Sequence, residues 1–331
     1  MIAFLSLWVQ VIGLFGEMGI MPIHDYMSRA AHHLGWGNVW ALPTVFWLDA
    51  SDVFLHVICG LGGLASLLLL FNIYPRIQLI VCFFLYLSFC QVGHPFLNFQ
   101  WDVLLLEIGF WSLFLVPWRG SLWRHLPPQW SVMGIWWLLF RLMMASGWVK
   151  IVSGDPVWAS FSALDFHFWS QPLPHFGGWL FDQFPSSIKR VFVGIMFIIE
   201  LFLPLAIWFG LRARKWVFYG VVMLMVLIFL TGNYGFFNLL TILLTCLLLT
   251  DTQWRHLIRF DVVIEPIRHS ANRFVYVGSF LVFFSVVYCG AALELRRFFN
   301  FDSVPAVFTP VQSTFQRLSL VNGYGLFAMM T

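Results

Sequence analysis

The chain has 331 residues, of which 60% are hydrophobic and only 10% are charged, and its formal net charge is +3. A mean hydropathy of +0.84 lies far above the values of soluble domains. This composition excludes a soluble enzyme and a nucleic-acid-binding module, and it predicts an integral membrane protein.

Apolar windows that are long enough to cross a bilayer as helices predict eight spans. They cover residues 53–71, 77–93, 103–117, 131–149, 191–211, 216–231, 235–250 and 274–293. A ninth window, residues 1–16, has no basic leader and no small-residue cleavage site, so it predicts a transmembrane helix and not a signal peptide. The predicted fold class is therefore all-α, a polytopic helical bundle of eight to nine transmembrane helices. The glycines between Gly60 and Ser66 predict a close approach of two helices.

Two connecting loops are long and rich in Trp, Pro, Gly and His. They are residues 22–52 and 153–189, and such half-polar aromatic stretches predict short interfacial or re-entrant helices. The predicted domains are a transmembrane helical domain, residues 1–293, and an extracytoplasmic tail, residues 294–331. The tail ends without a turn or a capping signal, which suggests the start of a further domain.

The distribution of Lys and Arg between alternate loops predicts the orientation. The loops on the side of the N-terminus carry more of these residues than the loops on the other side, and cytoplasmic loops are enriched in them. We therefore expect a cytoplasmic N-terminus and extracytoplasmic loops at 22–52 and 153–189. The expected location is a bacterial inner membrane, or the endoplasmic reticulum membrane if the source is eukaryotic.

Five ionisable residues fall within or at the ends of the predicted spans: Asp102, Glu107, Arg141, Lys150 and Glu200. A charge at the centre of a bilayer costs about 2.5–3.5 kcal/mol on insertion scales, so such residues usually face the interior of a bundle and have a partner. The helix rise of about 1.5 Å per residue predicts two layers. Asp102 and Lys150 form the outer one, and Arg141 with Glu200 or Glu107 forms the inner one.

The helical repeat also separates these residues around each helix. At about 100° per residue, the step from Arg141 to Lys150 turns the helix by roughly 180°, which predicts different partners for the two cations. Asp102 and Glu107 differ by about 140°, so they do not form a paired-carboxylate site. Two interpretations stay open for Lys150, which either pins helices through an ion pair or acts as a base in a pocket.

Several blocks of sequence resemble one family. They are "LPTVFWLDASD" (42–52), "FLNFQWDVLLLEIGFW" (96–111), "FRLMMASGWVKIVSGDPVW" (140–158), "FHFWSQPLPH" (166–175), "IELFLPL" (199–205), "LTGNYGFFNLLTILL" (230–244) and "VNGYGLFAMMT" (321–331). Together they resemble the lipase maturation factor family, and the chain looks more like bacterial members. Trp169 stands where the family commonly has Glu, and Ser160 stands where it has Asp.

The resemblance implies a polytopic membrane protein that helps secreted lipases, or other extracytoplasmic clients, to reach an active fold. Its expected partners are membrane lipids and a secreted lipase client, without nucleic acid. The residues expected to form the client-binding or structural motif are Gln100, Trp101, Asp102, Glu107, Arg141, Lys150, Trp158, His167, Gln171, Pro172, Glu200, Asn233 and Asn238.

A second, more distant resemblance supplies an alternative. The stretch "ASGWVKIVSGDPVW" (145–158) is similar to the membrane domain of the vitamin K-dependent carboxylase, which implies an enzyme acting on a lipid-soluble, quinone-like substrate with Lys150 as base. Five histidines in the extracytoplasmic segments lack the spacing of metal ligands, so no metal site is predicted. The sequence leaves the cofactor, the client and the oligomeric state unknown.

Overall fold

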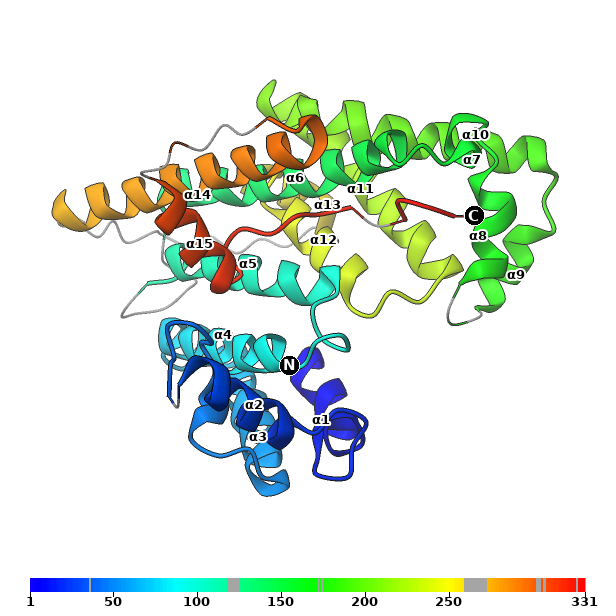
Figure 1. Ribbon diagram of the computed structural model, residues 1–331. Coiled ribbons are helices and arrows are strands. Elements are labelled where there is room, and N and C mark those ends of the chain that lie inside the picture. Colours follow the sequence, from blue (N-terminus) through cyan, green and yellow to red (C-terminus); the bar gives the residue numbers. More distant parts are fainter. Residues whose placement is uncertain are drawn as a thin grey trace. The chain divides into compact units, whose positions relative to one another are not determined.

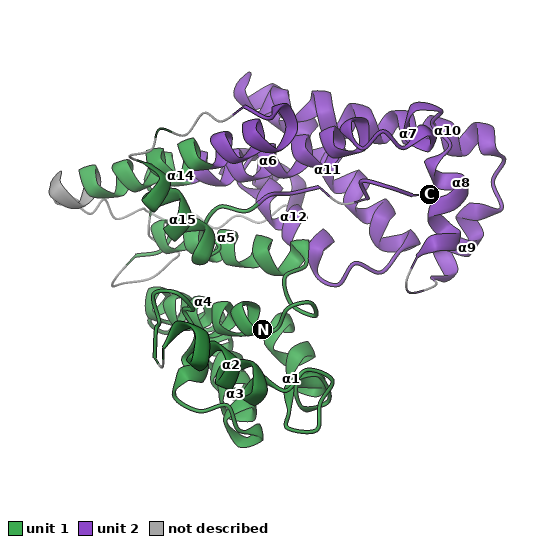
Figure 2. Ribbon diagram, viewed as in Figure 1, with its two compact units in different colours: residues 1–131, 264–289, 304–322 green, residues 132–263, 290–303, 323–331 purple. Residues whose placement is uncertain are grey.

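The computed structural model describes residues 1–35, 37–117, 126–171, 173, 175–258, 273–301, 305, 308–325 and 327–330. Within these ranges every regular element is a helix, as predicted (Figure 1). Contacts between Cα atoms divide the chain into two compact units (Figure 2). Unit 1 comprises residues 1–131, 264–289 and 304–322, and unit 2 comprises residues 132–263, 290–303 and 323–331.

Unit 1 contains the N-terminal helices. They are α1 (Ile2–Phe15), α2 (Ile23–Leu34), η1 (Val45–Trp47), α3 (Asp52–Leu70), α4 (Pro75–Val92) and α5 (Gln100–Leu115), followed late in the chain by the first part of α14 (Arg273–Phe299) and by α15 (Thr309–Arg317). Helix α3 packs against α1 and α4, and α4 packs against α5. The edge of the Trp111 ring on α5 meets Phe283 on α14, with ring centroids 5.8 Å apart.

The predicted small-residue contact on α3 is confirmed. A Cβ atom on Gly62 would lie 2.2 Å from the ring of Phe4, and one on Gly60 would lie 3.3 Å from the ring of Trp8. Because glycine has no side chain, the aromatic rings of α1 occupy this space on α3. Gly60 and Gly62 therefore allow α1 and α3 to lie close together.

Unit 2 contains the remaining helices. They are most of α6 (Gln129–Val152), α7 (Pro156–Ala159), α8 (Ala163–Ser170), α9 (Phe176–Asp182), α10 (Ser186–Phe197), η3 (Ile198–Phe202), η4 (Leu203–Trp208), α11 (Leu211–Thr231), α12 (Phe237–Cys246), α13 (Asp251–Ile258) and the end of α14. Helix α11 packs against α12, η4 and α9, and α8 packs against α9 and α10.

By length and hydropathy, six of the described helices can cross a membrane: Asp52–Leu70, Pro75–Val92, Gln129–Val152, Ser186–Trp208, Leu211–Thr231 and Val277–Phe299. The structure corrects the predicted span 235–250, since α12 ends at Cys246 and makes an angle of 119° with α13. This bent pair brings the number to seven if it is one span. Two further predicted spans correspond to shorter helices, α1 with 14 residues and α5 with 16.

The long loops contain short helices, as predicted. The segment 22–52 forms α2 and η1, and the segment 153–189 forms α7, α8 and α9 before α10 begins. The side chain of Asp155 caps α7 by accepting a hydrogen bond from the backbone N–H of Val157, and His175 caps α9 in the same way at Gly177.

Candidate functional site

A buried ion pair joins α6 to the segment after α10. Nζ of Lys150 lies 2.6 Å from Oε2 of Glu200 and also donates a hydrogen bond to the backbone oxygen of Ser146, at 2.9 Å. The two charged side chains are only 3% and 7% exposed. Because neither charge is open to solvent, each one satisfies the other inside unit 2.

The local structure explains how the pair can form. Glu200 lies in the π-helical turn Ile198–Phe202, and Pro204 follows in the 3₁₀ segment Leu203–Trp208. Proline has no backbone N–H, so it removes one helical hydrogen bond and favours such a change in pitch. A Cβ atom on Gly147 would lie 2.7 Å from the side chain of Leu201, so glycine at this position lets α6 approach the turn that carries Glu200.

A second polar contact joins α8 to the connection between α11 and α12. The hydroxyl of Tyr234 lies 3.0 Å from Nε2 of His167. Burial and the nearby Lys150 ammonium lower the pKa of His167 to about 4, and burial raises the pKa of Tyr234 to about 12. Both side chains are therefore neutral at neutral pH.

Close packing also joins the end of α8 and the start of α9 to the end of α11. Nε2 of Gln171 donates a hydrogen bond to the backbone oxygen of Thr231 at 3.1 Å. A Cβ atom on Gly177 would lie 1.8 Å from the backbone oxygen of Leu230, and one on Gly178 would lie 2.6 Å from that of Thr231. Only glycine allows the start of α9 to lie against the end of α11, and this packing holds His167 and Tyr234 within reach of each other.

These contacts surround a cavity of about 130 Å³ in unit 2. Lys150, His167, Glu200 and Tyr234 are among its lining residues, and Trp158 is another. Most of the remaining wall is aliphatic, aromatic or methionine. The site therefore combines two internally satisfied polar pairs with an apolar interior.

The last residues of the chain form part of the cavity wall. The Phe327 ring meets the rings of His167 and Tyr234 edge-on, with centroids 5.1 Å and 5.3 Å apart. Two hydrogen bonds attach this segment to α7: Nε1 of Trp158 donates to the backbone oxygen of Ala328, and the backbone N–H of Met330 donates to Oδ2 of Asp155.

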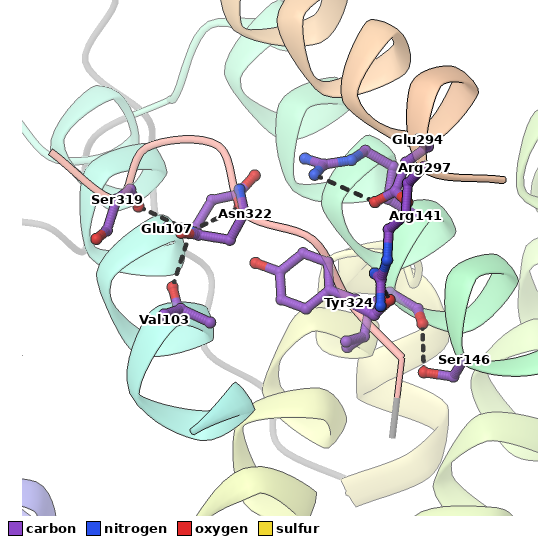
Figure 3. A network of polar contacts seen from close by, with 10 residues as sticks. Val103, Glu107, Arg141, Ser146, Glu294, Arg297, Ser319, Asn322 and Tyr324 are labelled. Atoms are coloured by element: carbon purple, nitrogen blue, oxygen red, sulfur yellow. Dashed lines mark hydrogen bonds and ion pairs between the residues drawn. The ribbon is translucent and has the colours of Figure 1, made fainter. Parts of the chain in front are cut away.

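Arg141 has a different environment from Lys150, as the helical repeat predicts, and of its two predicted partners, Glu200 and Glu107, the first is wrong. Nη2 of Arg141 lies 3.6 Å from Oε1 of Glu294, and its guanidinium lies 5.6 Å from the centre of the Tyr324 ring (Figure 3). Glu200 is instead the partner of Lys150. The absence of a side chain on Gly290 leaves room for the guanidinium, since a Cβ atom there would lie 3.0 Å from it.

The two acids of α5 belong to unit 1 and contact different groups. Oδ1 of Asp102 accepts a hydrogen bond from the Tyr86 hydroxyl at 2.6 Å, and Oδ2 accepts from the backbone N–H groups of Asn98 and Phe99. Glu107 is fully buried, and its Oε2 accepts from the backbone and side chain of Asn322 at 3.3 Å (Figure 3). The predicted pairing of Asp102 with Lys150 is therefore replaced by a contact with a tyrosine. The expectation that the acids do not share one site is confirmed.

The other predicted site residues have varied environments. Trp101 stacks on Phe99, with ring centroids 4.7 Å apart. Oε1 of Gln100 and both polar side-chain atoms of Asn238 are buried without a hydrogen-bond partner among the described residues, and Asn233 is exposed. Pro172 lies outside the described residues.

The sequence prediction missed the tyrosines and the asparagine that complete these contacts. Tyr86, Tyr234, Tyr324 and Asn322 contact Asp102, His167, Arg141 and Glu107 respectively. Tyr86 is a neutral residue of α4 and the other three lie outside the helices, so none of them gives the sequence signal of a charge within an apolar helix. Tyr234 and Tyr324 do lie in blocks that carry the family resemblance, and that was the available signal.

Comparison with known proteins assigns the family. The family model described as lipase maturation factor transmembrane domain matches residues 1–256. The chain belongs to the lipase maturation factor family. It is 36% identical to lipase maturation factor 2 of Xenopus tropicalis over 289 residues, which is 82% of this chain and 40% of that protein. No solved structure matches the chain.

Two further relatives extend this comparison. Human lipase maturation factor 2 is 39% identical over 271 residues, or 76% of this chain and 38% of the relative. Lipase maturation factor 1 of Bos taurus is 32% identical over 261 residues, or 73% of this chain and 45% of the relative. The chain thus spans about two fifths of the length of the curated relatives it matches.

Five of the sequence blocks that resemble the family meet in unit 2. Lys150 and Glu200 join the blocks 140–158 and 199–205, and His167 and Tyr234 join the blocks 166–175 and 230–244. Phe327 of the block 321–331 contacts the His167–Tyr234 pair. Blocks that are far apart in the chain therefore build one cavity.

Proposed function

We propose that this chain is a membrane-embedded maturation factor that helps a secreted lipase, or another extracytoplasmic client, to reach its active fold. The observation that carries the proposal is the convergence of five family blocks on one cavity directly joined to α8 and α9. The names of the relatives supply the client class, and the geometry supplies a surface on which a client can be held.

That surface is formed by exposed aromatic side chains on α8 and α9, which we call the α8–α9 aromatic surface and define as Phe166, Trp169, Phe176 and Trp179. Trp169, Phe176 and Trp179 are 79%, 75% and 61% exposed, and Phe176 stacks on Trp179 at 5.9 Å. Exposed aromatic groups on a rigid support suit transient contact with apolar surface that an unfinished client still exposes. The support here is the packing of Gly177 on Leu230.

The proposal includes an orientation. With the N-terminus in the cytoplasm, as the Lys and Arg distribution favours, the segments 22–52 and 153–189 face the extracytoplasmic side, where secreted clients fold. The α8–α9 aromatic surface then lies on that side. In spheroplasts of a bacterial host, a protease or labelling reagent that cannot cross the membrane should reach this surface, and reaction only after lysis would contradict the orientation.

The alternative, an enzyme with Lys150 as base, rests on a distant resemblance. A cavity does reach Lys150, but Glu200 and the Ser146 carbonyl both bind its ammonium. A protonated, paired lysine suits a role in fixing α6 against the π-helical turn better than a role in proton abstraction. We therefore base the proposed function on the maturation role.

The test measures lipase maturation directly. A homodimeric secreted lipase is produced with and without the full chain in a host that lacks a maturation factor, and secreted activity is divided by the amount of secreted lipase protein. We expect the chain to raise this specific activity. No increase with several lipases would overturn the proposed client class.

Variants locate the activity on the proposed surface. Trp169→Ala with Trp179→Ala should reduce the gain in specific activity by several-fold without changing the amount of the membrane protein. The matched control is Trp216→Ala on α11, whose side chain is 71% exposed but lies outside this surface. Equal losses from both changes would show that the α8–α9 aromatic surface has no special role.

A further inference from the structure

The wall of the unit 2 cavity has the properties of a site for a flexible alkyl chain. Four methionines contribute to it, Met143, Met196, Met225 and Met330, from three different helices and the last segment of the chain. Methionine side chains are unbranched and polarizable, so they adapt to apolar groups of varied shape. The remaining wall is mainly leucine, phenylalanine and other apolar residues, so a charged ligand would find little polar surface.

The polar groups of the cavity leave no net charge. The charges of Lys150 and Glu200 cancel at 2.6 Å, and both members of the His167–Tyr234 pair are neutral. A carboxylate or phosphate in this cavity would be buried without a free counter-ion, which is costly. An uncharged ligand avoids that cost.

The Tyr234 hydroxyl keeps hydrogen-bonding capacity toward a ligand. The hydroxyls of Ser146 and Thr231 donate to the carbonyls of Leu142 and Leu227 in their own helices. The Tyr234 hydroxyl either donates to Nε2 of His167 or accepts from it, because the roles depend on the tautomer. In the first case its oxygen can still accept a hydrogen bond, and in the second its hydrogen can still be donated. A ligand hydroxyl group fits both cases.

We propose that the unit 2 cavity binds an uncharged single-chain lipid, with its alkyl chain among the methionines and a hydroxyl group hydrogen-bonded to Tyr234. This goes beyond the proposed maturation function and does not depend on it. The cavity volume of about 130 Å³ is close to the roughly 150 Å³ of a cavity that holds benzene. It therefore holds a segment of the chain and not the whole lipid.

The experiment uses the full chain purified in detergent and two probes with the same alkyl chain. The probes are 1-monooleoylglycerol, which is uncharged and carries hydroxyl groups, and oleate, which is charged. Binding is measured by native mass spectrometry and by titration. We expect one equivalent of 1-monooleoylglycerol to bind at least 10-fold more tightly than oleate at neutral pH.

Variants of neighbouring residues assign the binding to the cavity. Met196→Trp fills the cavity and should weaken binding of 1-monooleoylglycerol at least 10-fold, whereas Ile195→Trp, on the same helix but outside the cavity lining, should not. Leu227→Phe with the control Val226→Phe provides the same comparison on α11. Tyr234→Phe should weaken binding about 2–10-fold, the range expected for one lost hydrogen bond.

Each result decides the proposal. Loss of 1-monooleoylglycerol binding in the cavity-filling variants alone, with unchanged thermal unfolding of the control variants, supports the proposal. If Met196→Trp does not fold, Leu227→Phe provides the test. The proposal is overturned by absent binding in the natural chain, by equal binding in cavity and control variants, or by oleate binding as tightly as 1-monooleoylglycerol. Displacement of 1-monooleoylglycerol by one equivalent of a peptide with apolar side chains would show instead that the cavity binds a protein ligand.

Discussion

Removing one charge from the Lys150–Glu200 pair should destabilise the protein far more than removing both. At 2.6 Å and an effective dielectric constant of about 20, the two charges attract by about 6 kcal/mol, and much of this attraction offsets the cost of burying them. Lys150→Met leaves the Glu200 carboxylate buried without its partner. We expect the free energy of unfolding to fall by about 3–5 kcal/mol, which corresponds to a decrease in Tm on the order of 10 °C.

The double variant Lys150→Met with Glu200→Leu removes both charges and fills similar volume with apolar groups. Its stability should lie within about 1 kcal/mol of the natural chain, or above it, because replacing a whole buried pair is often neutral or stabilising. The control is Lys215→Met, at an exposed lysine of α11, which should have little effect.

The assay is thermal or denaturant unfolding of the purified variants in one detergent at one pH. Equal stability of the Lys150→Met variant and the natural chain would refute the idea that Glu200 depends on Lys150. If the double variant is as unstable as Lys150→Met, the loss of stability in Lys150→Met does not come from an unpaired buried charge. A double variant that folds normally but no longer raises lipase specific activity would show that the pair has a functional role besides its structural one.

Two further predictions concern the contacts around His167. Since burial lowers its pKa to about 4 from 6.5, the folded chain binds this proton less readily than the unfolded chain. Stability should therefore fall as the pH drops from 6.5 to 4, by up to about 3 kcal/mol. His167→Gln should remove this part of the pH dependence, and parallel stability curves for both proteins would contradict the assignment. Gly177→Ala should cost about 1–3 kcal/mol, because the added Cβ would meet the Leu230 backbone oxygen at 1.8 Å. Gly194→Ala, whose nearest neighbour would be 3.8 Å away, should not destabilise the protein, and equal unfolding midpoints of the two variants would show that α9 can move away without cost.

The sequence by itself determined the class of protein and the positions of most of its helices. Hydropathy is a local property: a run of apolar residues must hydrogen-bond its own backbone in a bilayer, and a helix does so without help from distant parts of the chain. The helical repeat also determined that Arg141 and Lys150 have different partners, and that Asp102 and Glu107 do not share a site. Each of these statements depends on one helix alone.

The tertiary structure decided which groups meet. Depth along a span predicted Arg141 with Glu200 or Glu107 and Lys150 with Asp102, but depth says nothing about how neighbouring helices are rotated. In the structure the π-helical turn and Gly147 bring Glu200 to Lys150, whereas Arg141 contacts Glu294 and Tyr324. The sequence also did not predict that the span 235–250 breaks after Cys246, because hydropathy alone does not indicate where an apolar helix bends.

The stretch "FQWDVLLLEIGFW" (99–111) illustrates what the sequence determines and what only the tertiary structure decides. The cost of a buried charge indicated from the sequence alone that Asp102 and Glu107 have polar partners. Asp102 accepts a hydrogen bond from Tyr86, 16 positions earlier in the chain, and Glu107 accepts one from Asn322, 215 positions later. Neutral partners of this kind carry no hydropathy signal, so only the packed structure identifies them.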